Sequence, residues 1–254
     1  PTRVKNLYLG LREERGEKNE YAWSTMDRDL DMAVLEYAPG NSLVKDKLRH
    51  KVVGFTSNLT DPVSRGALTA KAVGRWWETE SYVALCSSCG SAKIMEEATD
   101  ADASCEDCQA TIPSDAFFRY VTPAAFRTDF KPSCDEETTP RLSHRMVATV
   151  LKKGFPIDQA NMRIWRGAGA TILQLNDGPM DAEGEATRFT VDETGDTSVP
   201  IPGHGSTLKL KDGQAIETNA RQKNSYRWQL SELGQQGLRV GLVSRKETDA
   251  VYLE

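Results

Sequence analysis

The chain has 254 residues, of which 39% are hydrophobic and 27% are charged, and its formal net charge at pH 7 is −5. This length and composition can bury the core of one large domain or of two small ones. The negative net charge disfavours a generic basic clamp for nucleic acid. The sequence contains no run of about 18 apolar residues, so it predicts no membrane-spanning helix.

Residues 1–10 lack the charged-then-apolar layout of a signal peptide, and the chain does not begin with Met. We therefore expect a fragment of a longer, cytoplasmic protein.

Residues 27–37 predict a short helix, with Asp27 as its N-cap. Leu30, Val34 and Tyr37 recur at helical spacing, so they should form the buried stripe of this helix. The Pro-Gly pair that follows should end the helix in a turn.

Residues 43–45 and 48–55 predict the two strands of a β-hairpin, which is joined near 46–47. A further strand over 76–85 should lead the chain to its first pair of cysteines. Another strand, over 117–121, should lead away from the second pair.

Four of the five cysteines form two Cys-x-x-Cys pairs, Cys86 with Cys89 and Cys105 with Cys108, and fifteen residues separate the pairs. This spacing is typical of a four-cysteine zinc site, because each pair turns two sulfurs to one side of a tight knuckle. Gly90, directly after the first pair, suits such a turn since glycine adopts positive φ readily. We predict one structural Zn²⁺ with four thiolate ligands and no open position for a water molecule.

Two disulfides or a redox pair are the alternatives. Disulfides need an oxidising compartment, of which the sequence gives no sign, and a thioredoxin-like motif uses one pair within a βαβ pattern. The remaining Cys134 is interpreted as a spare cysteine, the other interpretations being an alternative ligand or a reactive thiol. His50, His144 and His204 are isolated from one another, so no catalytic role is assigned to them.

The second half of the chain is strand-like in short pieces, which Gly, Asp, Asn and Pro separate. This pattern favours a mainly antiparallel sheet or barrel. The strands are expected at 144–151, 168–175, 187–191, 207–210, 239–244 and 250–253. The predicted fold class is therefore α+β with β dominant, and the zinc-ribbon-like knuckle is inserted into it.

The predicted organisation has three stretches. A helix and a hairpin occupy 1–75, the zinc-binding region occupies 76–133, and a β-rich segment occupies 134–254. Residues 178–203 are rich in Gly, Asp, Glu, Thr and Pro, so a mobile acidic loop is expected there.

The sequence shows no complete catalytic apparatus, and we expect no enzyme activity of this chain by itself. It has no Gly-x-x-x-x-Gly-Lys-Ser/Thr phosphate loop and no Gly-x-Ser-x-Gly elbow. Residues 135–138 resemble the acidic box of helicases but do not end a hydrophobic strand, so we interpret them as a solvated loop. For an autonomous nuclease the candidates would be Asp129, Asp135 and Glu136, but they form no motif.

Several strings occur in the same order as in a known group of helicases. They are Pro1-Thr-Arg-Val4, Arg28-Asp-Leu30, Glu36-Tyr-Ala-Pro-Gly40, Lys51-Val-Val-Gly-Phe55, the two Cys-x-x-Cys pairs, Val121-Thr-Pro-Ala-Ala-Phe-Arg-Thr-Asp-Phe130 and Leu242-Val-Ser-Arg-Lys-Glu-Thr-Asp249. Together they resemble the cysteine-containing region toward the C-terminus of large superfamily-two DEAD/DEAH-box helicases. Those helicases carry an associated domain of unknown function.

The resemblance implies a parent protein in which two RecA-like motor lobes precede this region and carry the ATPase activity. Relatives of this kind act in DNA repair and in anti-phage systems such as DISARM, where a companion protein shares this type of domain. The implied partners are thus the motor lobes, DNA and a subunit of a defence system.

Two functions follow from these observations. The first is an accessory region that contacts DNA, preferably single-stranded, because aromatic side chains stack on unpaired bases and arginines pair with phosphates. The candidate DNA contacts are Arg75, Trp76, Trp77, Arg119, Tyr120, Phe126, Arg127 and Lys131. The alternative is that these aromatics are buried in the core and the arginines are solvated. The second function is a protein-interaction module that docks the motor lobes or a partner subunit.

Overall fold

The structure is a computed structural model of the chain. It describes residues 3–13, 21–60, 63–64, 68–73, 75–128, 130, 132–134, 142–149, 157–159, 162–191, 197–200, 206–211, 214–219 and 238–253. Strands dominate these residues and the four paired cysteines gather in one knuckle-like group, so the predicted fold class is confirmed. In the described part of the chain, no helix is long and apolar enough to cross a membrane.

A five-stranded sheet contains most of the N-terminal part. In order across the sheet, its strands are β2 (Tyr21–Asp29), β1 (Val4–Glu13), β13 (Ala125–Thr128), β4 (Leu48–Thr56) and β3 (Ser42–Lys45). The predicted hairpin is confirmed as β3 and β4, and its turn holds Asp46 and Lys47 at φ angles of 54° and 65°. Positive φ at both central residues matches the twist that a two-residue hairpin turn needs.

The helix α1 is Leu30–Glu36, so its N-cap is Asp29 and the predicted N-cap at Asp27 is wrong. The reason is that β2 continues to Asp29, which pairs with Val4 of β1, and this ladder keeps the preceding residues extended. The stripe that was predicted to be buried is confirmed: it consists of Leu30, Val34 and Tyr37.

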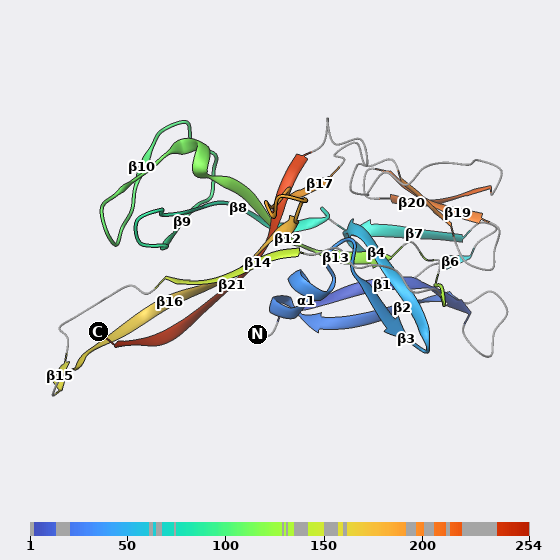
Figure 1. Cartoon of the computed structure of the whole chain (residues 1–254). Helices are drawn as coiled ribbons and strands as arrows, with labels where there is room; N and C mark the ends of the chain where they lie inside the picture. Colours follow the sequence, from blue (N-terminus) through green and yellow to red (C-terminus); the bar gives the residue numbers. More distant parts are fainter. Residues whose placement is uncertain are drawn as a thin grey trace.

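An eight-stranded sheet forms the middle of the molecule. Its main path is β14 (Leu142–Thr149), β16 (Met162–Pro179), β21 (Leu238–Leu253), β12 (Phe118–Pro123), β8 (Trp77–Leu85) and β9 (Ala92–Met95), with β15 (Ile157–Gln159) on β16 and β17 (Phe189–Val191) on β21. The strands predicted before and after the cysteines are confirmed as β8 and β12. Figure 1 shows β16 and β21 running together, away from the sheet of β1 to β4.

β21 is one strand where two were predicted, at 239–244 and 250–253. Its partner β16 is also longer than the predicted 168–175. The polar residues 245–248 of β21 pair with β16. Because β16 is long enough to pair with them, they stay in the strand and do not form a turn.

Smaller sheets complete the fold. One contains β18 (Thr197–Pro200), β19 (Ser206–Lys211), β20 (Gln214–Asn219), β7 (Leu68–Val73) and β5 (Asn58–Leu59), with β6 (Val63–Ser64) on β7, and the other pairs β10 (Ala103–Ser104) with β11 (Thr111–Ile112). The mobile acidic loop predicted at 178–203 includes β17 and β18, while its residues 192–196 and 201–203 lie outside the described residues.

Two of the described strand pairs are parallel, β1 with β13 and β12 with β21, whereas the other ladders are antiparallel as predicted. These parallel pairs connect the predicted stretches 1–75, 76–133 and 134–254 to one another. The three-part division of the chain stays a prediction.

Two hydrophobic cores lie on opposite faces of β12. Successive side chains of a strand point to opposite faces, and accordingly Val121 belongs to the first core and Tyr120 to the second. The first core joins the sheet to α1 and to the five-stranded sheet. The second core receives Ile94 from β9 and Val147 from β14, which are the two edges of the eight-stranded sheet. The sheet therefore curls around its second core.

Candidate functional site

The four paired cysteines form a compact cluster, as predicted. Their sulfur atoms all lie within 4.8 Å of one another, and two cross-pair distances, Cys86 to Cys108 and Cys89 to Cys105, are 3.6 Å. A tetrahedron with metal–sulfur bonds of about 2.3 Å has sulfurs about 3.8 Å apart. The cluster is thus already spaced to hold one metal ion.

The two knuckles fold in the same way. In each, the N–H of the first cysteine donates to the carbonyl five residues later, Cys86 to Ser91 and Cys105 to Ala110, both at 2.8 Å. These hydrogen bonds close each Cys-x-x-Cys segment into a tight loop, so both sulfurs of a pair face the same side. The repeated pattern explains why two short, polar segments meet with such regular geometry.

The residue after each second cysteine completes the turn in the left-handed region. Gly90 has φ of 76° and Gln109 has φ of 63°, and the N–H of each donates to the carbonyl of the first cysteine of its pair. Positive φ is costless for glycine and uncommon for other residues. The second knuckle therefore reproduces with Gln109 the conformation that the sequence predicted for Gly90.

A small apolar core supports the cluster. Cys86 and Cys105 are buried while Cys89 and Cys108 are exposed, so each pair offers one inner and one outer sulfur. The side chains packed with the inner sulfurs are Ala84, Ile112, Ala110, Ala116 and Phe117. Because Phe117 immediately precedes β12, the cluster also fixes where this strand begins.

Local hydrogen bonds prepare part of the cluster to bind a cation. The Ser91 hydroxyl and its backbone N–H lower the pKa of Cys89 to about 6, and backbone N–H groups of Cys89 and Ser88 lower the pKa of Cys86. At Cys108 the Ala110 N–H lowers the pKa, but the neighbouring sulfurs outweigh it and raise the pKa to about 12. Four thiolates so close together repel one another, and a bound cation would offset this repulsion.

Several residues predicted to contact DNA lie in the core instead. Arg127 is 0% exposed, and Trp76 and Tyr120 are buried, so none of them can reach a nucleic acid in this conformation. Trp76 stacks on Phe55 with ring centroids 5.4 Å apart, and Phe126 is buried beside the same ring. In this conformation the aromatic residues are core residues, which agrees with the alternative given above, and contact of this region with DNA stays a prediction.

The other predicted contacts are divided between two places. Arg75 is exposed and its guanidinium lies 5.3 Å from the ring centroid of Trp77, at one end of β8. Arg119, toward the other end of the β8–β12 ladder, donates to Glu80 at 2.8 Å. Lys131 lies outside the described residues.

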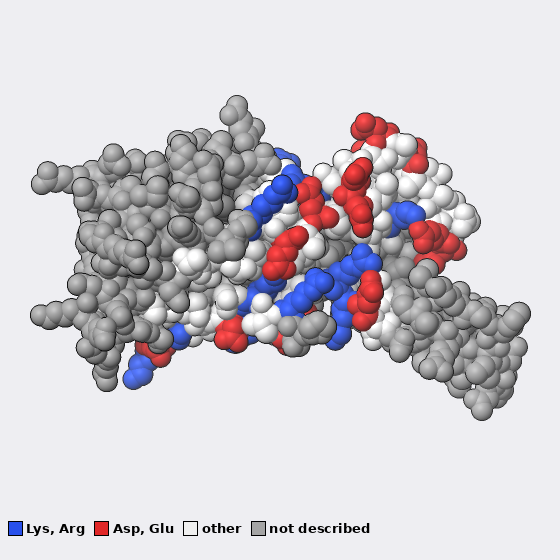
Figure 2. Space-filling model, turned by 180° about the vertical axis from the view of Figure 1, so that it is seen from behind, with Lys and Arg blue, Asp and Glu red and all other residues white. Residues whose placement is uncertain are grey.

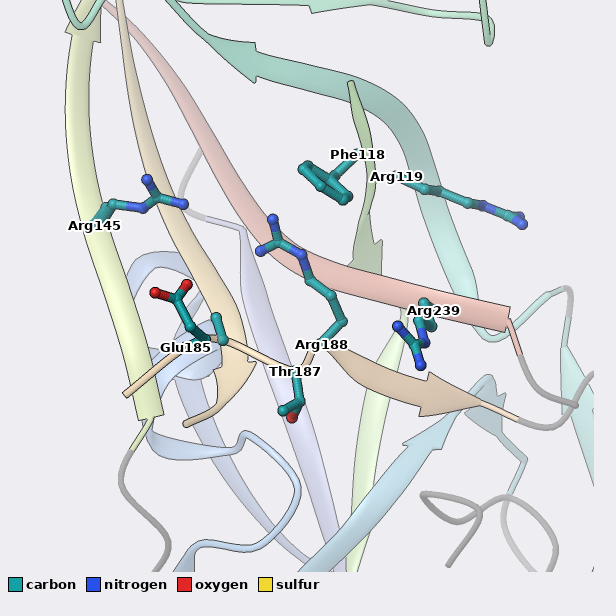
Figure 3. Close-up of a pocket in the computed structure, with 8 residues that line it drawn as sticks. Phe118, Arg119, Arg145, Glu185, Thr187, Arg188 and Arg239 are labelled. Atoms are coloured by element: carbon teal, nitrogen blue, oxygen red, sulfur yellow. The ribbon is translucent and has the colours of Figure 1, made fainter. Parts of the chain in front are cut away.

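A pocket of about 290 Å³ opens beside the start of β12. Its lining residues are Phe118, Arg119, Arg145, Glu185, Ala186, Thr187, Arg188 and Arg239. Figure 3 shows Arg145, Arg188 and Arg239 around the pocket, with the Phe118 ring next to the guanidinium of Arg188, whereas the guanidinium of Arg119 points away. The sequence analysis identified only Arg119 among these residues.

A buried carboxylate, that of Asp177, holds two of the arginines that line this pocket. Asp177 is 0% exposed and accepts hydrogen bonds from the Tyr120 hydroxyl, from Arg188 and from Arg145, whose Nε lies 2.8 Å away. The guanidinium of Arg188 also lies 4.5 Å from the ring centroid of Phe118 and 5.2 Å from that of Tyr120. Both arginines are therefore held in fixed positions.

Burial alone would raise the pKa of Asp177, but the Tyr120 hydroxyl and the guanidinium groups of Arg188 and Arg145 together hold this pKa below its ordinary value. Burial also raises the pKa of Tyr120, so its hydroxyl stays protonated and donates to the carboxylate. Asp177 thus remains ionised and keeps both arginines in place.

The backbone near Arg188 is constrained. Arg188 has φ of 66°, which is uncommon for a long side chain, and its N–H donates to the carbonyl of Asp177 at 3.1 Å. At Gly178 a Cβ would come within 2.7 Å of the Arg188 backbone, so only glycine permits this close approach. Unusual φ values outside glycine cost of order 1–3 kcal/mol and gather at functional sites.

The described part of one face mixes the two signs of charge. Figure 2 shows basic and acidic side chains alternating over the described part of one face. Of the isolated residues considered above, Cys134 and His144 are exposed, His50 is buried and His204 lies outside the described residues. The arginine pocket is therefore a local concentration of positive charge.

Comparisons with protein families, with curated proteins and with solved structures found no match for this chain.

Proposed function

We propose that this chain is a non-catalytic, zinc-binding accessory region of an ATP-dependent DNA helicase, which contacts single-stranded DNA during repair or anti-phage defence. The observation that carries the proposal is the position of the cysteine cluster directly before β12. There the cluster fixes the segment that presents an exposed aromatic ring, Phe118, among several arginines.

The choice of zinc rests on the donor set. Four thiolates at tetrahedral spacing suit Zn²⁺ or an iron centre, and zinc is the ion that two Cys-x-x-Cys knuckles most often hold as a structural element. A zinc ion with four sulfur ligands has no position for an activated water molecule, so its role would be to stabilise the fold.

The helicase part of the proposal rests on the resemblance of the ordered strings described above. In that arrangement the motor lobes hydrolyse ATP and this region supplies contacts to the displaced strand. Aromatic and arginine side chains together are the usual means of binding single strands without sequence preference. Besides the pocket, the exposed Arg75 and the adjacent Trp77 ring provide a second pair of this kind.

The test is fluorescence anisotropy of the zinc-loaded chain with labelled single-stranded and duplex DNA at two salt concentrations. The expected result is stronger binding to single strands and a steep loss of affinity with salt, because binding releases condensed counterions. No binding at low salt would overturn the DNA role and favour the alternative, a module that docks the motor lobes or a partner subunit.

A further inference from the structure

The arginine pocket has an excess of positive charge. Three guanidinium groups, those of Arg145, Arg188 and Arg239, line it together with one carboxylate, that of Glu185, and the buried Asp177 binds Arg145 and Arg188. Arg119 also lines the pocket, but its guanidinium points away and pairs with Glu80 (Figure 3). Arg239 is exposed and has no hydrogen-bond or ion-pair partner among the described residues. One positive charge is therefore left without a counter-charge among the described residues.

These groups come from distant parts of the chain. Phe118 is on β12, Arg145 on β14 and Arg239 on β21, while Arg188 immediately precedes β17. Alternation along β12 and β14 puts Phe118 on the same side as Tyr120 and Arg145 on the same side as Val147, which is the concave side of the sheet. The curl of the sheet thus gathers the arginines.

We infer that this pocket binds a phosphate group of a nucleotide, with the phosphate between the arginines and the base against the ring of Phe118. If the phosphate belongs to a DNA strand, this inference rests on the proposed function and names the contact through which the chain would bind DNA. A free nucleotide offers the same chemistry.

Guanidinium groups match the geometry of phosphate oxygens, since they donate two parallel hydrogen bonds from one plane. Arg145 uses Nε and Nη2 for Asp177, and Arg188 uses Nη1, so each retains donors that Asp177 does not occupy. Because the carboxylate already fixes both side chains, a phosphate would meet pre-organised donors and lose little affinity to side-chain ordering.

The volume of the pocket and the ring of Phe118 indicate a ligand larger than an inorganic ion. A volume of about 290 Å³ is close to the lower limit of pockets for small organic ligands, about 300 Å³. Phe118 is 47% exposed although it is a large apolar residue, and the guanidinium of Arg188 lies over its ring. An exposed ring beside fixed arginines is suited to stacking on a base.

The experiment compares two arginines of β21 in the full chain. Arg239→Gln removes the pocket arginine that has no described partner, and Arg245→Gln is the matched control because Arg245 is 51% exposed and pairs with Glu247 outside the pocket. We expect Arg239→Gln to weaken binding of labelled oligothymidylate about tenfold and to lower the salt slope by about one, whereas the control changes affinity less than twofold.

A second arm separates the source of the phosphate. Inorganic phosphate and thymidine 5′-monophosphate are titrated into wild-type and Arg239→Gln protein, and the arginine Nε–Hε resonances are followed by NMR. We expect shifts at Arg145 and Arg188 that saturate at lower concentration for the nucleotide than for phosphate, and that weaken in the variant.

Each result bears on one proposal or the other. If oligothymidylate binds but the two variants behave alike, the pocket inference is overturned while the DNA role survives. If the oligonucleotide does not bind but the nucleotide does so through Arg239, the pocket is a site for free nucleotides and the DNA role fails. Absence of binding in both arms overturns both proposals.

Discussion

The ring of Tyr120 lies against the backbone of Gly241, where a Cβ would come within 2.4 Å of the ring. The two residues face each other across the parallel pair β12 and β21. Because Gly241 has no side chain, the Tyr120 ring has room beside this strand, and its hydroxyl donates to the buried Asp177. The absence of a side chain at Gly241 thus makes room for the Tyr120 ring. Tyr120 in turn binds Asp177, the carboxylate that orients Arg145 and Arg188.

Gly241→Ala should therefore destabilise the protein. The added methyl group would overlap the Tyr120 ring, and overpacking of this kind costs about 1–3 kcal/mol. The free energy of unfolding from urea denaturation measures the effect. In a Tyr120→Ala background the same glycine substitution should cost much less, because the overlapping ring is absent. An equal cost in both backgrounds would contradict the proposed contact.

At neutral pH, Asp177→Asn should lower the free energy of unfolding more than Gly241→Ala does. It removes a charge that is 0% exposed and leaves the guanidinium groups of Arg188 and Arg145 without their shared carboxylate. Removal of one partner of a buried ion pair costs roughly 3 kcal/mol. Urea unfolding at pH 7 measures this cost, and Glu185→Gln is the control, because Glu185 is exposed and forms no ion pair with the described residues.

Acid should remove the stability that Asp177 contributes through its contacts with Tyr120, Arg145 and Arg188. The pKa of Asp177 is lower in the folded protein than in the unfolded chain, so ionisation of Asp177 stabilises the fold above the ordinary aspartate pKa of about 3.9. That stabilisation is lost as the pH falls below 3.9 and through the lowered pKa. The difference in stability between wild type and Asp177→Asn should hence shrink between pH 5 and pH 2. A constant difference over that range would be inconsistent with an ionised Asp177.

The metal site and the local hairpin could be predicted from sequence because their signals are short-range. Cys86 and Cys89 lie within one turn, as do Cys105 and Cys108, and metal-ligand spacing requires only that the two turns meet. The hairpin of β3 and β4 is likewise decided by adjacent residues. Such patterns remain visible without knowledge of the tertiary fold.

The arginine pocket could not be predicted in this way. Arg145, Arg188 and Arg239 are dozens of residues apart and follow no common spacing. They meet only because β14 and β21 belong to one curled sheet, and the parallel pairing of β12 with β21 was not predicted. Long-range pairing of strands leaves no local mark in the sequence beyond alternation.

Arg127 illustrates the same limit. A basic residue after the cysteines suggested a DNA contact, yet the structure buries its side chain completely. We expect Arg127→Ala to lower the free energy of unfolding by about 3 kcal/mol, because the change leaves a cavity among groups that were packed around a charge. DNA affinity, measured where the variant is still folded, should stay within twofold of wild type. A tenfold loss without destabilisation would restore Arg127 to the DNA contacts.

The cysteine cluster should bind one metal ion per chain, and we expect elemental analysis of purified protein to find about one equivalent of zinc. Cys105→Ser removes an inner, buried sulfur, so it should abolish most of the bound zinc and unfold the region around residues 80–130, since metal binding supplies folding energy there. Cys134→Ser is the matched control, because Cys134 is exposed and outside the cluster.

The same pair of variants tests the connection between the metal and the pocket. Phe117 packs on the cluster and Phe118 lines the pocket, so loss of the metal should displace the start of β12. Chelation of the wild-type metal should accordingly weaken oligothymidylate binding as much as Arg239→Gln does, and added zinc should restore it. Cys134→Ser should respond to chelator and zinc as the wild type does. If Cys105→Ser kept its zinc content and its DNA affinity, both the metal assignment and this connection would be wrong.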